Sequence, residues 1–226
     1  MVDPGSERPW KERSEAMQAT RSKPAGAEVK AVEPRRQEDA VTAALLTFVD
    51  GITFYRPLTV YFSTPVTTGP WFYEALAQAG AQGAVDSIPS HLLESVRAEA
   101  VAQNLTLSAI TAVRIRERLP KHTVINPSML EVSEWTQQQY IQFWMDVIDR
   151  SVGKVVLGPG WGFSTGCTLE CARSMALGIP VLDQYLEPIT AVEAFEIVRH
   201  SIDSILANGL TPSGLLSAAA ALEKLV

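Results

Sequence analysis

The chain has 226 residues, of which 46% are hydrophobic and 19% charged. This length suits one full domain with extensions but not two ordinary domains, and the composition excludes a wholly disordered protein. The net charge of −6 lies outside residues 1–40, in which eight basic residues balance eight acidic ones, so the acidic remainder argues against a nucleic-acid partner.

The sequence also bears on location and cofactors. No run approaches the ~18 consecutive apolar residues of a membrane span, and the first residues lack the apolar region of a secretory signal. Cys167 and Cys171 stand four apart in a predicted helix, which suits neither a disulfide nor, with two thiols alone, a metal site. His91, His122 and His200 show no metal-ligand spacing. We therefore expect a soluble, cytoplasmic protein with no membrane partner, no metal and no cofactor.

Two regions differ in composition. Residues 1–38 are rich in Pro, Gly and charged residues and have almost no large apolar side chains, which predicts a disordered tail, or alternatively an arm that folds on a partner. Residues 39–226 are predicted to form a single α/β domain, in which 40–48 form a short helix.

Within 39–226, strands and helices alternate. Buried strands are predicted at 58–62, 122–126, 154–157 and 179–182. Helices are predicted at 71–79, 91–119 (broken near Asn104), 134–150 (with Ser133 as N-cap), 167–177, 190–207 and 212–225. This alternation predicts a Rossmann-like, doubly wound parallel sheet flanked by helices, with ligands at the carboxyl ends of the strands.

The segment most informative about chemistry joins the third predicted strand to the next helix. It reads GPGWGFSTG, in which Gly160, Ser164 and Gly166 precede the helix. Glycines let a backbone approach a ligand closely, and a helix N-terminus offers free N–H groups to an anion. The same pattern also fits a helix N-cap and a tight turn without a ligand, and it is neither a Walker loop nor a GxGxxG fingerprint.

Two carboxylates are candidates for catalysis. Glu170 is predicted in the first turn of the helix after this loop, where it either complements the helix dipole or, kept ionised by that field, acts as a nucleophile. Asp146 lies at the margin of the apolar stripe of helix 134–150, where it could reach a cleft or merely pair with Arg150. Asp149 lies nearly opposite the stripe and should be solvated.

A family resemblance rests on four features: the sequence VINP at 124–127, Asp146, the loop GPGWGFSTGCTLECA, and GIPVL at 178–182. Together they resemble the nucleoside 2-deoxyribosyltransferase-like superfamily, and within it the branch with a Gly-Trp-x-x-Ser-x-Gly-x-x-x-Glu motif that includes nucleotide N-glycosidases. The match covers residues 58–183, and the chain departs from the pattern by an insertion at 80–120.

The resemblance implies a function and a set of site residues. Glu170 would attack the anomeric carbon of a nucleoside or nucleotide, with assistance from Asp146, in a hydrolase or a base-exchanging transferase. Ser164 and Gly166 would bind the 5′-phosphate. The other implied substrate contacts are Tyr61, Ser63 and Thr64 in the loop after the first strand, and Gly160 and Trp161. A homo-oligomer, a dimer or higher, is also expected.

Other interpretations remain open from the sequence. The domain could be a non-catalytic nucleotide sensor of Rossmann-like type, or a structural partner protein that acts through its tail. Trp71, Phe72 and Tyr73 are predicted to be core residues, although Trp71 or Tyr73 could stack on a base.

Overall fold

The structure is a computed structural model that describes residues 34–226 except 54 and 134, and it describes side chains from residue 41 onward. The predicted tail therefore lies almost wholly outside the described residues, although the first described helix already begins at Pro34, within its predicted bounds. Contacts separate Asp39–Val226 as one unit, and the description below concerns that unit.

Seven helices and six strands are described in chain order. The helices are α2 (Pro34–Ile52), α3 (Pro70–Gln78), α4 (Ser90–Arg118), α5 (Gln137–Ser151), α6 (Thr165–Ala176), α7 (Ala191–Ala207) and α8 (Ser213–Glu223). The strands are β1 (Thr59–Ser63), β2 (Gly83–Ala84), β3 (Thr123–Ile125), β4 (Lys154–Leu157), β5 (Val181–Leu182) and β6 (Leu210–Thr211). Among the described residues, no helix is both long enough and apolar enough to cross a membrane.

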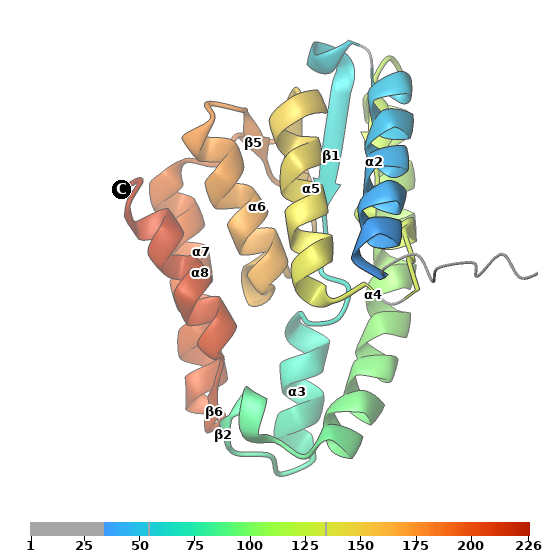
Figure 1. Cartoon of the computed structure of the whole chain (residues 1–226). Coiled ribbons are helices and arrows are strands. Elements are labelled where there is room, and N and C mark those ends of the chain that lie inside the picture. The colour runs from blue at the N-terminus through green and yellow to red at the C-terminus, as the bar shows by residue number, and fades with distance from the viewer. Residues whose placement is uncertain (1–33, 54, 134) are drawn as a thin grey trace, which may run out of the picture. The chain divides into compact units, whose positions relative to one another are not determined.

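The central sheet has the order β3-β1-β4-β5, and every pairing in it is parallel. Tyr61 stands opposite Ile125 on one side and Val155 on the other, so β1 is an inner strand. These are the four strands that the sequence predicts, and the α/β fold with a parallel sheet between helices is confirmed (Figure 1). The paired two-residue strands β2 and β6 were not predicted.

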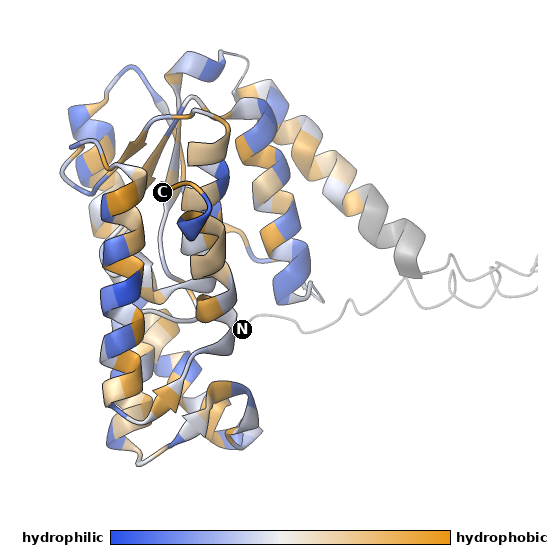
Figure 2. Ribbon diagram, turned by 90° about the vertical axis from the view of Figure 1, so that its left-hand side faces the viewer, coloured by the Kyte–Doolittle hydropathy of each residue, from blue (hydrophilic) through white to orange (hydrophobic). Residues whose placement is uncertain are grey.

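Side chains of β1 alternate between the two faces of the sheet, as the period of a strand requires. Val60 and Phe62 pack with Ala112 and Ile115 of α4. Tyr61 belongs instead to the larger apolar cluster that includes side chains of α5 and α6. Figure 1 shows α5 and α6 side by side, with β1 next to α5, and Figure 2 shows both hydrophilic and hydrophobic residues along the helices that flank the sheet.

The strand order contains a reversal. The chain runs from β1 outward to β3, then returns past β1 to β4 and continues to β5. The crossover helices α4 and α6 pack on opposite sides of β1. Open parallel sheets bind ligands in the crevice at such a switch point, which here lies at the carboxyl ends of β1 and β4.

Two details of the predicted helices are wrong. Helix α4 runs without a break through Asn104, because that amide bonds to carbonyls outside the helix and does not compete for its own backbone. Helix α5 takes its N-cap from Thr136 and not from Ser133, because Thr136 and Gln139 form a reciprocal capping box.

Candidate active site

Glu170 lies in α6, the helix that follows β4. We expected it in the first turn because the helix was predicted to begin at Cys167, but α6 begins at Thr165. Glu170 is therefore the sixth residue of the helix and lies in its second turn. Its side chain faces β1 and is buried, with 7% of the residue exposed.

Two hydroxyls of β1 hold the Glu170 carboxylate. The Tyr61 hydroxyl donates to Oε1 at 2.7 Å, and the Ser63 hydroxyl donates to Oε2 at 2.6 Å. Tyr61 and Ser63 are both fully buried and stand two residues apart, so they point to the same face of the strand. Both residues are expected from the sequence to contact the substrate, whereas the structure joins them to Glu170.

The ionisation of Glu170 differs from the sequence-based expectation. Burial raises the pKa of Glu170 from its ordinary 4.5 to about 7, although the hydrogen bonds from Ser63 and Tyr61 act in the opposite direction. The dipole of a helix acts mainly within its first turn, so it does not keep this carboxylate ionised as we expected. Burial and the neighbouring Glu170 raise the pKa of Tyr61 well above its ordinary value, so Tyr61 is a neutral donor.

Ser164 is the N-cap of α6. Its hydroxyl accepts a hydrogen bond from the backbone N–H of Cys167 at 3.4 Å, and the residue is buried. The capping interpretation of this serine is thus confirmed, while its contact with a phosphate stays a prediction.

Cys167 and Cys171 are buried free thiols in the core, as expected. Burial raises the pKa of each to about 12, so neither is a thiolate.

Gly160 and Gly162 are explained by packing within the protein. A Cβ on Gly160 would lie 2.6 Å from Cδ of Pro70, and the residue has a φ of +70°. A Cβ on Gly162 would lie 2.9 Å from both Ile197 and Ser201. These glycines therefore allow chain segments to approach each other, and the contact of Gly160 with a substrate stays a prediction.

Gly166 has a different environment. A Cβ there would meet no atom closer than the Ser164 hydroxyl, at 3.9 Å. Gly166 is the second residue of α6, whose first backbone N–H groups have no partner within the helix. An anion could thus approach the helix N-terminus at this residue.

The other predicted substrate contacts are mostly buried. Trp161 begins a short 3-10 helix, Trp161–Phe163, and belongs to the main apolar cluster. Thr64 is buried directly after β1. Of the three aromatic residues at the start of α3, Phe72 and Tyr73 are buried as expected, but Trp71 is 44% exposed and the prediction that it is a core residue is wrong.

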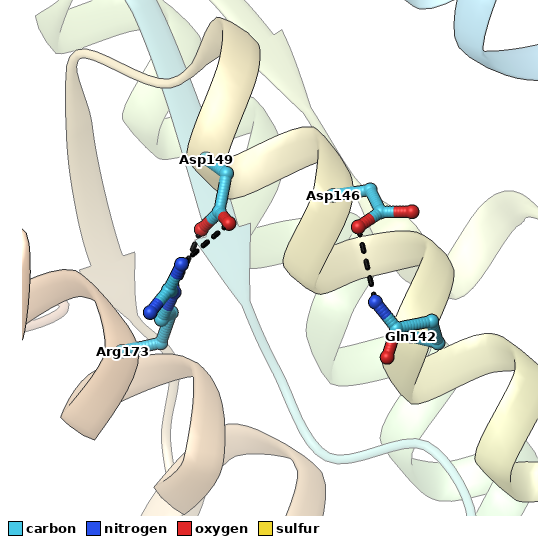
Figure 3. A network of polar contacts seen from close by, with 4 residues as sticks. All are labelled: Gln142, Asp146, Asp149 and Arg173. Carbon is cyan, nitrogen blue, oxygen red and sulfur yellow. Dashed lines mark hydrogen bonds and ion pairs between the residues drawn. The ribbon is translucent and has the colours of Figure 1, made fainter.

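Asp146 and Asp149 point to different sides of α5 (Figure 3). Asp146 accepts a hydrogen bond from the amide of Gln142 at 3.0 Å, so its partner is Gln142 and not the suggested Arg150. Asp149 is not simply solvated, since it forms a two-bond ion pair with Arg173 of α6 at 2.8 and 2.6 Å. No contact described for Asp146 joins it to Glu170, so its catalytic role stays a prediction.

A pocket of about 220 Å3 adjoins the same glycine-rich loop. It opens at the carboxyl ends of β4 and β5 and is lined by Leu157, Gly158, Pro159, Gly160, Trp161, Gly162, Phe163, Asp183, Gln184, Ile197 and Ser201. Glu170 does not line it.

Sequence reasoning missed Asn104, which the structure places against the loop after β1. The available signal was an asparagine in the interior of a long helix, which we interpreted as a break.

His91 and His200 are exposed, and His122 lies 3.2 Å from Lys154. No group of three acidic, His or Cys side chains suited to a metal occurs in the described part of the chain.

Comparison of the chain with protein-family models, with curated proteins and with solved structures found no significant match.

Proposed function

We propose that this protein is an enzyme that cleaves the N-glycosidic bond of a nucleoside or nucleotide, with Glu170 as the nucleophile. The observation that carries the proposal is the buried Glu170 carboxylate, held by Tyr61 and Ser63 at the switch point of a parallel sheet. Membership of the nucleoside 2-deoxyribosyltransferase-like superfamily is part of the proposal and is supported by the sequence motif.

The proposed reaction proceeds in two steps. An oxygen of Glu170 forms a bond to C1′ of the sugar while the C1′–N bond breaks, and the base leaves with the bonding electron pair and takes up a proton. Water then attacks C1′ as the bond between C1′ and Glu170 breaks, which releases the sugar and restores the carboxylate. One hydrogen of the water stays on the new sugar hydroxyl, and the other leaves as a proton, which balances the proton that the base took up. This is the carboxylate-nucleophile scheme of retaining glycoside hydrolysis. If a second base replaces water, the same intermediate gives base exchange.

The surroundings of Glu170 suit this role. The two hydroxyl donors fix both carboxylate oxygens, so the nucleophile has one orientation. With a pKa of about 7, roughly half of the Glu170 side chains are ionised at neutral pH, and a carboxylate stripped of water is more reactive than a solvated one.

The N-terminus of α6 supports a phosphorylated substrate. Gly166 leaves open space beside the first turn of this helix, and Glu170 lies one turn further along it. A phosphate at the helix N-terminus would place the sugar of a 5′-nucleotide toward the carboxylate. A homo-oligomeric assembly and a cytoplasmic location accompany this proposal as expectations from the sequence.

The experiment is incubation of the protein with a panel of nucleosides and 5′-monophosphates, followed by chromatography for free base. Wild-type protein should release base from at least one of them, and Glu170→Gln should reduce the rate at least a thousandfold, because an amide cannot act as a carboxylate nucleophile. Glu196→Gln makes the same change on the exposed surface of α7 and should retain wild-type activity.

One observation favours a second candidate, a nucleotide sensor without turnover. The proposed assistant Asp146 bonds to Gln142, on the side of α5 away from Arg173 and α6 (Figure 3). A sensor needs neither carboxylate for chemistry. Binding of a panel nucleotide without release of base would support the sensor and overturn the enzyme.

A further inference from the structure

Helix α4 carries buried polar side chains on the face that packs against the sheet. Asn104, Ser108 and Thr111 recur along this face, which also presents Ala112 and Ile115 to the core. A buried polar group destabilises a protein unless it is hydrogen-bonded, so the partners of these side chains indicate what they do.

Asn104 bonds to the loop at 64–69 that joins β1 to α3. Its amide nitrogen donates to the carbonyl of Val66 at 2.9 Å and to the carbonyl of Thr68 at 2.5 Å. Asn104 is 4% exposed, and these two bonds use both hydrogens of its amide. The loop carbonyls thus depend on a side chain more than thirty residues away in sequence.

The loop fits closely against this side chain. A Cβ on Gly69, which has a φ of +110°, would lie 3.4 Å from the Asn104 amide oxygen and 3.1 Å from Pro65. The next residue, Pro70, lies against Gly160 of the glycine-rich loop. The loop at 64–69 is therefore held between α4 and the segment that leads to Glu170.

Ser108, one turn further along α4, contacts the loop after β3. Its hydroxyl lies 3.0 Å from the Asn126 amide nitrogen and 2.8 Å from the Ser128 hydroxyl. One face of α4 thus contacts the loops at the carboxyl ends of two neighbouring strands, β1 and β3.

We propose that Asn104 is a positioning residue that fixes the β1–α3 loop for substrate binding, and that α4 thereby sets substrate affinity. This inference rests on the proposed function, in which Glu170 attacks the sugar beside Tyr61 and Ser63, so that the loop directly after Ser63 adjoins the reacting carbon. It assigns a role to the insertion at 80–120, because Asn104 and Ser108 both lie within it.

The test compares Asn104→Asp with the matched change Gln103→Glu. Both replace an amide by a carboxylate and add one negative charge, but Gln103 is bonded to Glu99 of the same helix and not to the loop. In Asn104→Asp the carboxylate cannot donate to Val66 and Thr68, so cleavage within 64–69 in limited proteolysis should be about tenfold faster. The KM for the panel substrate should rise about tenfold while kcat stays within about twofold.

Each outcome is decisive. Unchanged proteolysis would show that Asn104 does not hold the loop, and faster proteolysis with an unchanged KM would show that the loop is not part of the substrate site. If Asn104→Asp does not fold, Asn104→Ala removes the donors without adding a charge and is tested in the same way. Wild-type protein that cleaves no panel compound overturns the proposed function and the affinity role with it, while the proteolysis still decides whether Asn104 holds the loop.

Discussion

At the scale of single residues, each oxygen of the Glu170 carboxylate accepts a hydrogen bond from one hydroxyl group of β1. The alternation of a strand already indicates that Tyr61 and Ser63 share a face. What the sequence could not provide is the distance between β1 and residue 170, because this contact depends on how the sheet and α6 pack. The carboxylate could thus be named from the motif, but its partners could not.

The first prediction concerns the pH dependence of catalysis. Since Glu170 must be ionised to attack, kcat/KM should rise with pH around a midpoint near the pKa of about 7. Ser63→Ala removes a hydrogen bond that lowers this pKa, so the midpoint should move upward by about one to two pH units. A pH–rate profile measures this shift.

The control for that profile is Ser151→Ala. Ser151 is also a buried serine, but its hydroxyl bonds to Asp50. Its removal should leave the midpoint where it is in the wild type. Equal midpoints in wild type and Ser63→Ala would contradict the role of Ser63 in setting the ionisation of Glu170.

The second prediction concerns stability and does not depend on any activity. The pKa of Glu170 in the folded state, about 7, lies above its ordinary 4.5, so the folded protein holds the proton more tightly than the unfolded chain. The resulting stabilisation is complete below pH 4.5 and is lost as the pH rises through 7. Glu170→Gln lacks this titration, so its free energy of unfolding relative to wild type should increase by roughly 2.5 kcal/mol between pH 5 and pH 8.

Urea denaturation of both proteins at the two pH values measures this difference. Every other titrating group is common to the two proteins and cancels in the comparison. A difference that stays the same at pH 5 and pH 8 would show that Glu170 titrates near its ordinary value in the folded protein.

At the scale of elements, the segment that runs from β4 into the first turn of α6 contains glycines of two kinds. Gly160 accommodates Pro70, whereas Gly166 faces open space at the helix N-terminus. Glycine fits both situations equally well, so the sequence alone left open whether this segment binds a ligand or forms an N-cap and a tight turn. The structure assigns tight packing to the first glycine and leaves the second available to a ligand.

A matched pair of substitutions separates the two kinds. Gly160→Ala places a Cβ against Pro70 at a positive φ, and it should lower the free energy of unfolding by about 1–3 kcal/mol. Gly166→Ala adds a methyl group to a helical position without a close neighbour, and it should leave stability equal or raise it by up to about 1 kcal/mol. Thermal or urea unfolding measures both changes.

Gly166→Ala, which should not destabilise the protein, should instead weaken the binding of a phosphorylated substrate. If a phosphate lies against Gly166, the new methyl group should raise KM for a 5′-monophosphate at least tenfold while the fold is unaffected, and it should barely alter KM for the nucleoside. Wild-type KM values for both compounds in Gly166→Ala would place the phosphate elsewhere.

Helices with a regular apolar stripe were predicted within a few residues, whereas other elements depended on tertiary contacts. Helix α4 was expected to break at Asn104 because asparagine competes with helical backbone in an isolated segment. The two-residue strands β2 and β6 carry no periodic pattern and exist through their pairing with each other. The N-cap of α5 at Thr136 could have been predicted, since the capping-box spacing is present in the sequence.

At the scale of the whole unit, the parallel sheet was predictable because four short apolar runs alternate with helical segments, and the right-handed crossover rule leaves few arrangements. The site was predictable only in part. Tyr61, Ser63 and Glu170 do meet, but Asp146 bonds to Gln142. The helical wheel could not predict this partner, because it gives the angle of a side chain and not the neighbour that the side chain meets.

The pairing of β1 with β4 has a consequence for folding. The hydrogen bond between Tyr61 and Glu170 spans 109 positions of the chain, and β1 pairs directly with a strand more than ninety residues later. Closing such long loops costs conformational entropy before any contact compensates for it, which slows folding. A growing polypeptide therefore lacks the inner strand pair until residue 157 has left the ribosome, and it lacks the carboxylate site until residue 170 has followed.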